Sequence, residues 1–359
     1  MVLMWMVGRV WLDGKSHLPS IETKNYDGIS VIIAARNEEF FIASCLNIIL
    51  NNDLDSSRWE VIVVDDHSTD STWSVLESFK HKNLKILQLP THLTGKKKAV
   101  NYGIKASQFS WILLTDADCM VDHNWINDHL EWANKSAALG ITGIVLPEKR
   151  HSLVSDFQWL DFAATMALTN FGIQSHLYYL SNGANFGFAK SVFESVHGFE
   201  GNDYMASGDD VFLMQKISRT NPNTAYFLQS KSTIVTTKAE PDWKSLFQQR
   251  KRWASKSKHK GNEGVVYIQG FVFIYCCAIV LAMLGGIFSI SFLYVGIFAL
   301  LFKMITDYIF LRKMANFFDY PQVLRSFLPS YFIYFIHIFV SAWFAIFPSK
   351  FWWKSRSVR

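Results

Sequence analysis

Short apolar runs alternate with more polar, helix-compatible stretches in the first third of the chain. Four runs are rich in valine, isoleucine and leucine, and they lie within residues 29–39, 59–70, 84–89 and 111–118. Apolar runs of this kind, bounded by polar turns, are typical of buried strands. Helical patterns follow the first run through Ile49 and fill residues 95–107. Strands that alternate with helices predict an α/β domain with a mostly parallel sheet, whose functional loops share one edge.

Further along, residues 156–179 form an amphipathic helical pattern that carries Trp159, Phe162, Met166 and Phe171. Such a helix packs in a core or between domains, or else it rests on a membrane surface. We favour core or interdomain packing.

The last hundred residues have a different pattern. The apolar segments 265–284 and 287–310 each reach the roughly 20 residues that a membrane-spanning helix needs. Lysines and arginines precede the first and follow the second, while the loop between them is uncharged. The positive-inside rule therefore places the globular domain in the cytosol. A third apolar segment, 327–347, would leave the basic tail outside if it crossed simply, so a re-entrant hairpin and an interfacial helix both stay open.

These patterns divide the chain into three parts. Residues 1–26 are expected to be an interfacial anchor or the end of a longer helix, since their apolar run is too short to span a bilayer. Residues 27–260 are expected to form the globular domain, and residues 261–359 a membrane region with two to three apolar helices and a basic tail. The protein is thus expected to be a multi-pass protein of the cell (inner) membrane with a cytoplasmic catalytic domain.

Composition narrows the range of expected binding partners. The chain is 50% hydrophobic and 16% aromatic, with a formal net charge of +5. Since no basic stripe interleaved with aromatic residues occurs, we expect no nucleic-acid partner. The four cysteines include no CxxC pair, so we expect reduced core or lipid-facing residues in a cytosolic protein. The oligomeric state stays open.

Acidic pairs end two of the predicted strands. Asp116 and Asp118 are oxygen donors of the kind that Mg²⁺ and Mn²⁺ prefer, although capping of a turn explains them equally well. Asp65 and Asp66 end another strand, where a carboxylate can accept hydrogen bonds from a base or a ribose. Capping of the following helix is compatible with that role, because Ser68 or a later acid can cap while Asp66 faces the cleft.

A third pair, Asp209 and Asp210, stands at a predicted helix N-terminus, where the helix dipole favours ionised carboxylates. Such a carboxylate is suited to act as a general base, although helix-terminal acids are commonly structural. The cations Arg36, Lys96, Arg250 and Arg252 are suited to neutralise a diphosphate leaving group. We expect Lys97 and Lys98 to lie on a solvated helix face.

In their order and spacing, these motifs resemble those of the family-2 glycosyltransferases of the GT-A fold, over roughly residues 29–255. The matching stretches are ARNEE, VVDDHSTD, GKKKAVN, TDAD, GANFGFAKS, GDD and QRKRW. The resemblance implies a Rossmann-like, mostly parallel GT-A catalytic domain followed by C-terminal transmembrane helices. His67 stands where the family usually has glycine, and Asp209 where glutamate is more common. The residues after Trp253 also depart from the family pattern, which leaves acceptor handling open.

The resemblance also implies residue roles. Asp66 would contact the nucleotide base, with Ala34, Arg36 and Glu38 in the loop around it and Lys96 nearby. Asp118, supported by Asp116, would hold Mg²⁺ or Mn²⁺ on the diphosphate. Asp210 would be the catalytic base, with Asp209 beside it. The family's QxxRW motif, which closes over the diphosphate and the acceptor entrance, matches Gln249, Arg250, Arg252 and Trp253.

We therefore expect a membrane-anchored, inverting glycosyltransferase that moves a sugar from a UDP-sugar to a hydroxyl or phosphate of a membrane lipid. A processive polysaccharide synthase is the alternative, since both kinds carry QxxRW. A haloacid-dehalogenase-like phosphatase fits less well, because its DxD strand normally comes first in the domain. A non-catalytic membrane scaffold is also less favoured, because every expected acid and cation is present.

Overall fold

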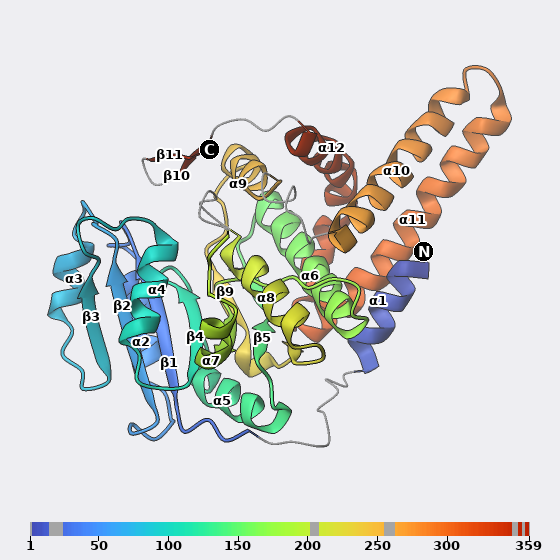
Figure 1. Cartoon of the computed structure of the whole chain (residues 1–359). Helices are drawn as coiled ribbons and strands as arrows, with labels where there is room; N and C mark the ends of the chain where they lie inside the picture. The colour runs from blue at the N-terminus through green and yellow to red at the C-terminus, as the bar shows by residue number, and fades with distance from the viewer. Residues whose placement is uncertain are drawn as a thin grey trace.

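The computed structural model describes residues 2–13, 24–201, 208–254, 263–346, 351–353 and 356–358. Among these residues, a central sheet has the strand order β3-β2-β1-β4-β7-β5-β8 (Figure 1). Its strands are β1 (Ile29–Ala35), β2 (Trp59–Asp65), β3 (Leu84–Gln88), β4 (Trp111–Asp116), β5 (Gly140–Gly143), β7 (Phe186–Ala189) and β8 (Ala225–Leu228). The predicted α/β fold with a mostly parallel sheet is confirmed.

The register of the sheet decides where polar side chains meet. Strand β1 pairs in parallel with β2 and β4, so that Ala34 lies opposite both Val64 and Asp116. Strand β7 runs antiparallel to both of its neighbours, β4 and β5. A smaller parallel sheet joins β6 (Val145–Pro147) to β9 (Val235–Thr237). Because β1, β2 and β4 are parallel, the residues that follow them share one edge.

Helices surround the central sheet (Figure 1). They are α2 (Ile42–Leu50), α3 (Thr72–Ser78), α4 (Lys96–Ala106), α5 (Trp125–Ser136), α6 (Leu153–Gln174), α7 (Lys190–Ser195), α8 (Asp209–Thr220) and α9 (Trp243–Ala254), with the 3₁₀ turn η1 (Lys231–Thr233). Helix α6 begins where the Ser152 side chain accepts a hydrogen bond from Ser155 N at 3.2 Å. Most of its residues are buried, which confirms core and interdomain packing for this segment.

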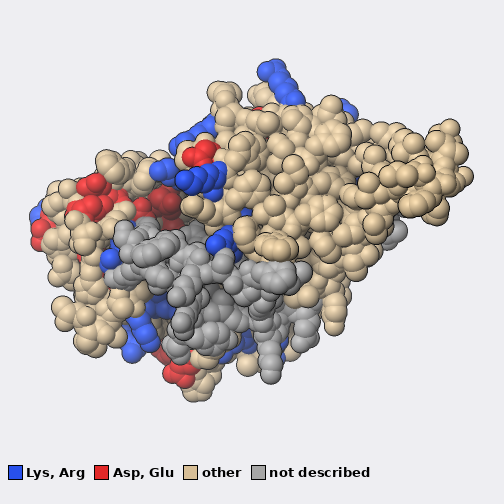
Figure 2. Space-filling model, turned by 90° about the horizontal axis from the view of Figure 1, so that it is seen from above, with Lys and Arg blue, Asp and Glu red and all other residues tan. Residues whose placement is uncertain are grey.

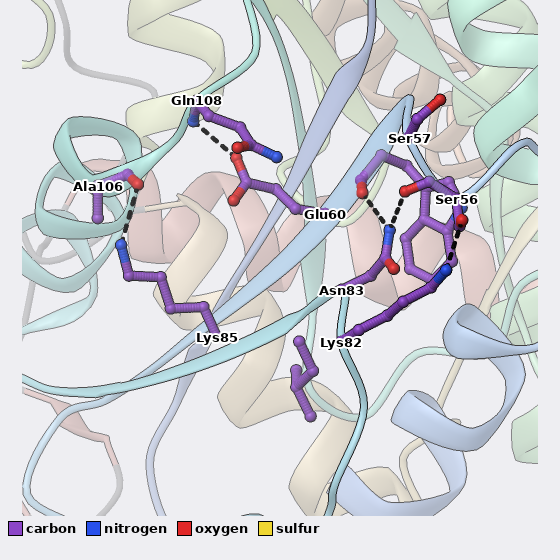
Figure 3. A pocket seen from close by; sticks show the side chains of 10 residues that line it. Ser56, Ser57, Glu60, Lys82, Asn83, Lys85, Ala106 and Gln108 are labelled. Carbon is purple, nitrogen blue, oxygen red and sulfur yellow. Dashed lines mark hydrogen bonds between the residues drawn. The ribbon is translucent and has the colours of Figure 1, made fainter.

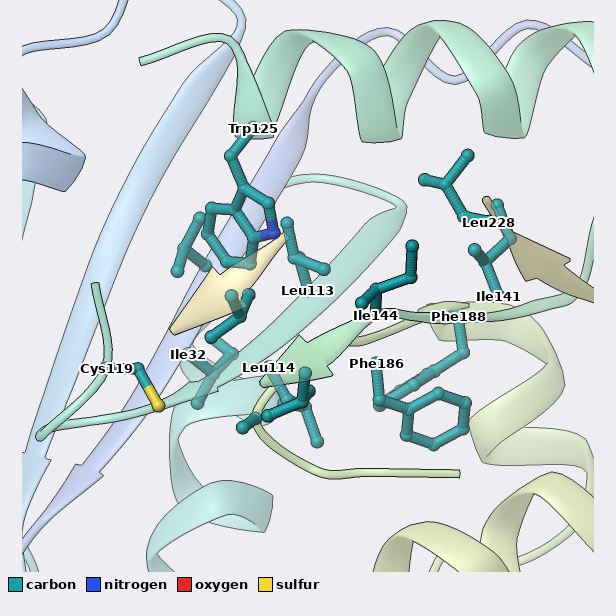
Figure 4. Close-up of a cluster of buried hydrophobic side chains, with 14 of the residues drawn as sticks. Ile32, Leu113, Leu114, Cys119, Trp125, Ile141, Ile144, Phe186, Phe188 and Leu228 are labelled. Carbon is teal, nitrogen blue, oxygen red and sulfur yellow. The ribbon is translucent and has the colours of Figure 1, made fainter. Parts of the chain in front are cut away.

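The core of the globular part lies between the sheet and its helices. Figure 4 shows side chains from β1, β4, β5 and β7 packed together, among them Ile32, Leu113 and Phe186. Beside them, the buried amide of Asn185 joins several elements. Its Nδ2 donates to Ile144 O at 2.9 Å and to Thr233 O at 2.8 Å. Its Oδ1 lies 3.1 Å from Trp125 Nε1 and 2.8 Å from His129 Nε2, so one side chain ties β7 to α5 and η1.

The C-terminal part consists of apolar helices. They are α10 (Glu263–Gly285), α11 (Ile290–Phe317) and α12 (Phe327–Ile346), with the 3₁₀ turn η2 (Pro321–Ser326) before α12 and the short strands β10 (Phe351–Trp353) and β11 (Arg356–Val358) after it. Within the described residues, three helical segments are long and apolar enough to cross a membrane: 264–285, 290–317 and 321–344. Helices α10 and α11 project as a hairpin whose apolar side chains are exposed, such as Phe288 at 89% (Figure 1). An apolar surface of this size needs lipid or a partner to cover it.

The first helix, α1 (Val2–Asp13), packs against α6 and α11. Its Trp11 is buried among Phe227, Phe317 and Phe318, with ring centroids between 5.2 and 5.9 Å away. The N-terminal segment thus joins the globular part to the apolar helices. All four cysteines are free thiols, as predicted.

Replacement of Asn185 by alanine should destabilise the protein by at least about 3 kcal/mol, because several buried polar groups would lose their partner at once. Thermal unfolding of the detergent-solubilised protein measures the effect. The exposed Asn51, replaced in the same way, serves as the control and should leave the midpoint unchanged. Equal midpoints for the two variants would contradict the structural role of Asn185.

Candidate active site

A pocket of about 440 Å³ opens at the carboxyl edge of β1, β2 and β4. The predicted site residues that line it are Ala34, Arg36, Glu38, Asp66, Lys96, Asp116, Asp118, Asp209, Asp210, Gln249 and Trp253. Figure 2 looks onto this side of the molecule and shows acidic and basic side chains together over the globular half, while the projecting hairpin is uncharged on this face. Residues from six separate parts of the sequence therefore meet in one place.

The end of β2 is held by its neighbours. Arg36 Nη1 donates to Asp66 O at 2.5 Å and to His67 O at 3.0 Å. His67 has a φ of +56°, a conformation that glycine adopts most readily, which fits the glycine that the resemblance implies at this position. The buried Asp66 carboxylate accepts a hydrogen bond from Gly95 N at 3.0 Å. Asp70 accepts from Thr72 N at 3.0 Å at the start of α3, whereas the N-cap residue Ser71 makes no side-chain capping hydrogen bond.

Asp116 ends β4 and Asp118 follows it, and both are half-buried at the pocket wall. Lys96, the first residue of α4, forms an ion pair with Asp116. No group of three or more His, Cys, Asp or Glu side chains in the described part of the chain has the arrangement of a metal site. Two carboxylates fit a hard divalent cation whose remaining ligands come from substrate phosphates and water. The donor set is thus suited to Mg²⁺ or Mn²⁺ shared with a diphosphate.

Asp209 and Asp210 are the first two residues of α8, as predicted. Asp210 Oδ2 accepts from Gly183 N at 2.7 Å and Oδ1 accepts from Val211 N at 2.9 Å, so two backbone amides hold the carboxylate. The prediction that Lys97 is solvated is wrong: its side chain is only 11% exposed and its Nζ lies 3.3 Å from Asp209 Oδ1. The first turn of α4 faces the acids of α8, which draws this lysine inward, while Lys98 is exposed as expected.

Desolvation raises the pKa of Asp209 from 3.8 to about 6, although Lys97 acts in the opposite direction. Asp210 raises the pKa further and Lys96 lowers it. The carboxyl group therefore titrates close to neutral pH in the folded protein.

Helix α9 forms another wall of the pocket. Gln249 Nε2 donates to Glu240 Oε1 at 2.8 Å, and both residues line the pocket with Trp253. Arg250 is buried and its Nη2 lies 2.6 Å from Asp161 Oδ2 on α6, so its guanidinium faces α6. The side chain of Arg252 lies outside the described residues.

The sequence reasoning missed several pocket residues. Lys238 and Glu240 follow β9, and Phe162 comes from α6. The Lys238 ammonium lies 4.2 Å from the centroid of the Phe41 ring. Charged residues directly after a short β-branched run were the available signal for Lys238 and Glu240, and it resembles the signal that identified Asp66 and Asp116.

A second cavity, of about 520 Å³, lies near the opposite edge of the sheet around Glu60 and Asn83 (Figure 3). Its polar side chains bond within the protein. Asn83 Nδ2 donates to Ser56 O and Trp59 O at 2.6 Å, and Lys82 Nζ donates to Ser56 Oγ at 2.7 Å. Ser30 Oγ donates to Glu60 Oε1 at 2.6 Å. Because the polar groups of this cavity are used in bonds within the protein, the pocket at the carboxyl edge is the better candidate for the active site.

Comparisons with known proteins agree with the geometry. Residues 30–193 match the family described as Glycosyl transferase family 2. The chain is 26% identical over 275 residues to the probable glycosyltransferase YdaM of Bacillus subtilis, a match that covers 71% of this chain and 58% of that protein. It is 24% identical over 346 residues to a poly-beta-1,6-N-acetyl-D-glucosamine synthase of Staphylococcus epidermidis, which covers 91% of this chain and 80% of the synthase.

Among solved structures, the chain is similar to the mannosyltransferase PcManGT from Pyrobaculum calidifontis in complex with GDP-Man and Mn²⁺. The TM-score is 0.60 at 17% identity, and the superposition covers 96% of this chain and 94% of the other. At this identity the likeness concerns the fold.

The raised pKa of Asp209 predicts a pH dependence of stability. Its carboxyl group binds a proton more tightly in the folded protein, at about 6, than in the unfolded chain, at 3.8. Its contribution to stability is therefore full below pH 3.8 and is lost as the pH rises through about 6. Asp209→Asn, which cannot ionise, should gain in unfolding midpoint relative to the wild type as the pH rises from 3.8 to about 6. Parallel midpoints across this range would contradict the assignment.

Proposed function

The chain carries a family-2 glycosyltransferase domain of the GT-A fold, and on this premise we propose that it moves a sugar from a UDP-sugar to a membrane lipid, with inversion at the anomeric carbon. One observation carries the proposal: the acids expected to handle nucleotide, metal and acceptor all line a single pocket. The wall of that pocket, α9, packs against the apolar helix α12. An acceptor hydroxyl or phosphate at the membrane surface therefore lies within reach.

Each side chain has a role in this proposal. Asp66 holds the nucleotide base, with Ala34, Arg36 and Glu38 around it. Asp116 and Asp118 hold Mg²⁺ or Mn²⁺, and a cation bound there supplies positive charge to the diphosphate as it leaves. Lys96 adds a further positive charge at the same place. The fold is shared with a mannosyltransferase whose structure contains a nucleotide-sugar and Mn²⁺, which supports this arrangement.

Asp210 acts on the acceptor. As the acceptor oxygen attacks the anomeric carbon from the face opposite UDP, the Asp210 carboxylate takes the hydroxyl proton. The bond between that carbon and the diphosphate oxygen breaks, and its electron pair leaves with UDP. Two backbone amides hold the carboxylate in place, so its orientation is fixed before the acceptor arrives.

The exposed apolar hairpin α10–α11 and helix α12 anchor the protein in the membrane, with the catalytic domain in the cytoplasm. The uncharged tip of the hairpin and the basic residues near its base support this orientation.

A processive polysaccharide synthase is the second candidate. Similarity to a poly-beta-1,6-N-acetyl-D-glucosamine synthase over 91% of the chain favours it. Product length separates the two, since a lipid transferase stops after one sugar and a synthase makes a polymer.

Nucleotide release by the purified protein tests the proposal. We would supply a panel of UDP-sugars, with GDP-mannose as the alternative donor, in the presence and absence of Mg²⁺ or Mn²⁺. Vesicles that contain polyprenyl phosphate, diacylglycerol or ceramide would serve as acceptors. Metal-dependent release that needs one of these lipids supports lipid transfer, and a polymeric product supports the synthase. No release from any donor contradicts both.

Asp210→Asn should lower the transfer rate by about 10²–10⁴-fold, because the positioned base is lost. Binding of UDP, measured by calorimetry, should stay unchanged. The exposed Asp27, replaced by asparagine, is the control and should transfer at the wild-type rate. Loss of UDP binding in a folded Asp210→Asn protein would contradict the role as base.

Asp118→Ala should abolish the effect of Mg²⁺ or Mn²⁺ on UDP affinity, because a main carboxylate ligand is removed. Titration of UDP with and without metal measures it. Asp122→Ala removes a nearby, exposed acid and should keep the metal effect. An unchanged metal effect in Asp118→Ala would assign the cation to other residues.

A further inference from the structure

One face of α6 holds the acceptor-side wall of the pocket. Gln158, Asp161 and Phe162 are spaced so that their side chains share this face. Gln158 Oε1 accepts from Glu240 N at 2.9 Å, and its Nε2 donates to Glu240 O at 3.0 Å. These two bonds fix the backbone of a residue that lines the pocket. The loop after β9 is thus anchored to α6.

The same face holds α9 through a buried ion pair. Asp161 Oδ2 and Arg250 Nη2 are 2.6 Å apart, with side chains 17% and 7% exposed. The Arg250 guanidinium lies 4.4 Å from the centroid of the Trp253 ring and 5.4 Å from that of Phe162. The Phe162 and Trp253 rings meet edge to face at 5.5 Å, and both line the pocket. The carboxylate of Asp161 therefore controls, through one cation, where two aromatic rings of the wall lie.

Helix α6 also contacts the apolar helix α12. Phe157 packs against Trp243 of α9 and His337 of α12, with ring centroids 5.5 and 5.7 Å away. Tyr334 of α12 packs against the same cluster, formed by residues of α6 and α9. The pocket wall and a membrane helix are thus positioned by one element.

A buried guanidinium without a charged partner is strongly unfavourable, so the Arg250 guanidinium stays next to the Asp161 carboxylate. An indole stacked on a desolvated cation is in turn held by the attraction of the ring for the charge. Arg250 faces α6 and does not line the pocket, whereas Trp253 does. Through these contacts Arg250 holds Trp253 in position in the wall of the pocket.

We propose that Asp161 is a positioning residue for the acceptor: through Arg250 it holds Trp253 at the acceptor entrance, on the pocket-wall helix α9 that packs against the apolar helix α12. This inference rests on the proposed glycosyl transfer and assigns its acceptor side. The donor side, formed by Asp66, Asp116 and Asp118 on the sheet, does not depend on the pair.

Asp161→Asn tests the assignment, because it removes the charge and keeps the size. We would measure acceptor-dependent kcat/KM with the nucleotide-sugar that the wild type prefers and the lipid vesicles named above. The value should fall about 10²-fold, because a small displacement of a positioning group commonly lowers the rate by this factor. The fall should be in the acceptor KM, while the Kd for UDP stays unchanged. Asp161→Glu keeps the charge and should recover most of the activity.

Asp156→Asn is the matched control. Asp156 is a half-buried acid on the same helix, but it accepts from Tyr320 and Ser326, at the two ends of η2, and not from α9. This variant should keep the acceptor KM of the wild type. An unchanged acceptor KM in Asp161→Asn, or equal effects of the two substitutions, would overturn the proposal.

Two further measurements keep the outcome clear. If Asp161→Asn does not fold, Arg250→Lys keeps the charge but loses the planar stacking on Trp253, and it should raise the acceptor KM without changing the Kd for UDP. An unchanged acceptor KM in Arg250→Lys also overturns the proposal.

A double-mutant cycle of Asp161→Asn with Arg250→Gln, read as unfolding midpoints, tests the ion pair without any activity measurement. Additive midpoints would overturn the ion-pair link itself, whereas the absence of nucleotide release in the wild type would overturn only the proposed reaction.

Discussion

Repulsion among clustered carboxylates is the constraint on which the candidate active site depends. Asp66, Asp116, Asp118, Asp209 and Asp210 line one pocket, and like charges in a partly desolvated space disfavour each other. The start of α4 offsets this repulsion, because Lys96 pairs with Asp116 and Lys97 with Asp209. Gly95 makes the arrangement possible, since its φ of +101° turns the chain into α4 while its N–H bonds to Asp66.

The two sides of the pocket have different mechanical support. The donor side consists of residues that follow parallel strands, and the ladder of β1 with β2 and β4 fixes their spacing. The acceptor side consists of α9 and the loop after β9, which side chains of α6 hold in place. Because α6 also packs against α12, the acceptor side is tied to the membrane region. In the proposed reaction, such a division would let a fixed nucleotide site serve an acceptor that arrives from the bilayer.

The apolar helices contain an ion pair of their own. Lys303 and Asp307 lie one turn apart on α11 and form an ion pair with both side chains largely buried. Charged side chains within an apolar span are costly unless they are paired inside the helix bundle. The pairing offsets the two charges inside the apolar stretch of α11, whereas Arg312 and Lys313 lie near the end of the helix.

The sequence by itself determined the strands of the donor side, because a buried parallel strand needs a continuous apolar run and its ligand-binding acids follow directly. Asp66 and Asp116 could be placed in this way, Asp210 could be placed at a helix N-terminus, and the apolar helices could be recognised from length and composition. Only the tertiary structure decided that Lys97 turns inward to Asp209, that Glu240 lines the pocket and that Arg250 pairs with Asp161. Partners such as Asp161 and Arg250 are far apart in the chain, and neither residue has a local pattern that specifies the other. Their contact exists because α6 and α9 pack together, and that packing follows from the burial of the whole core.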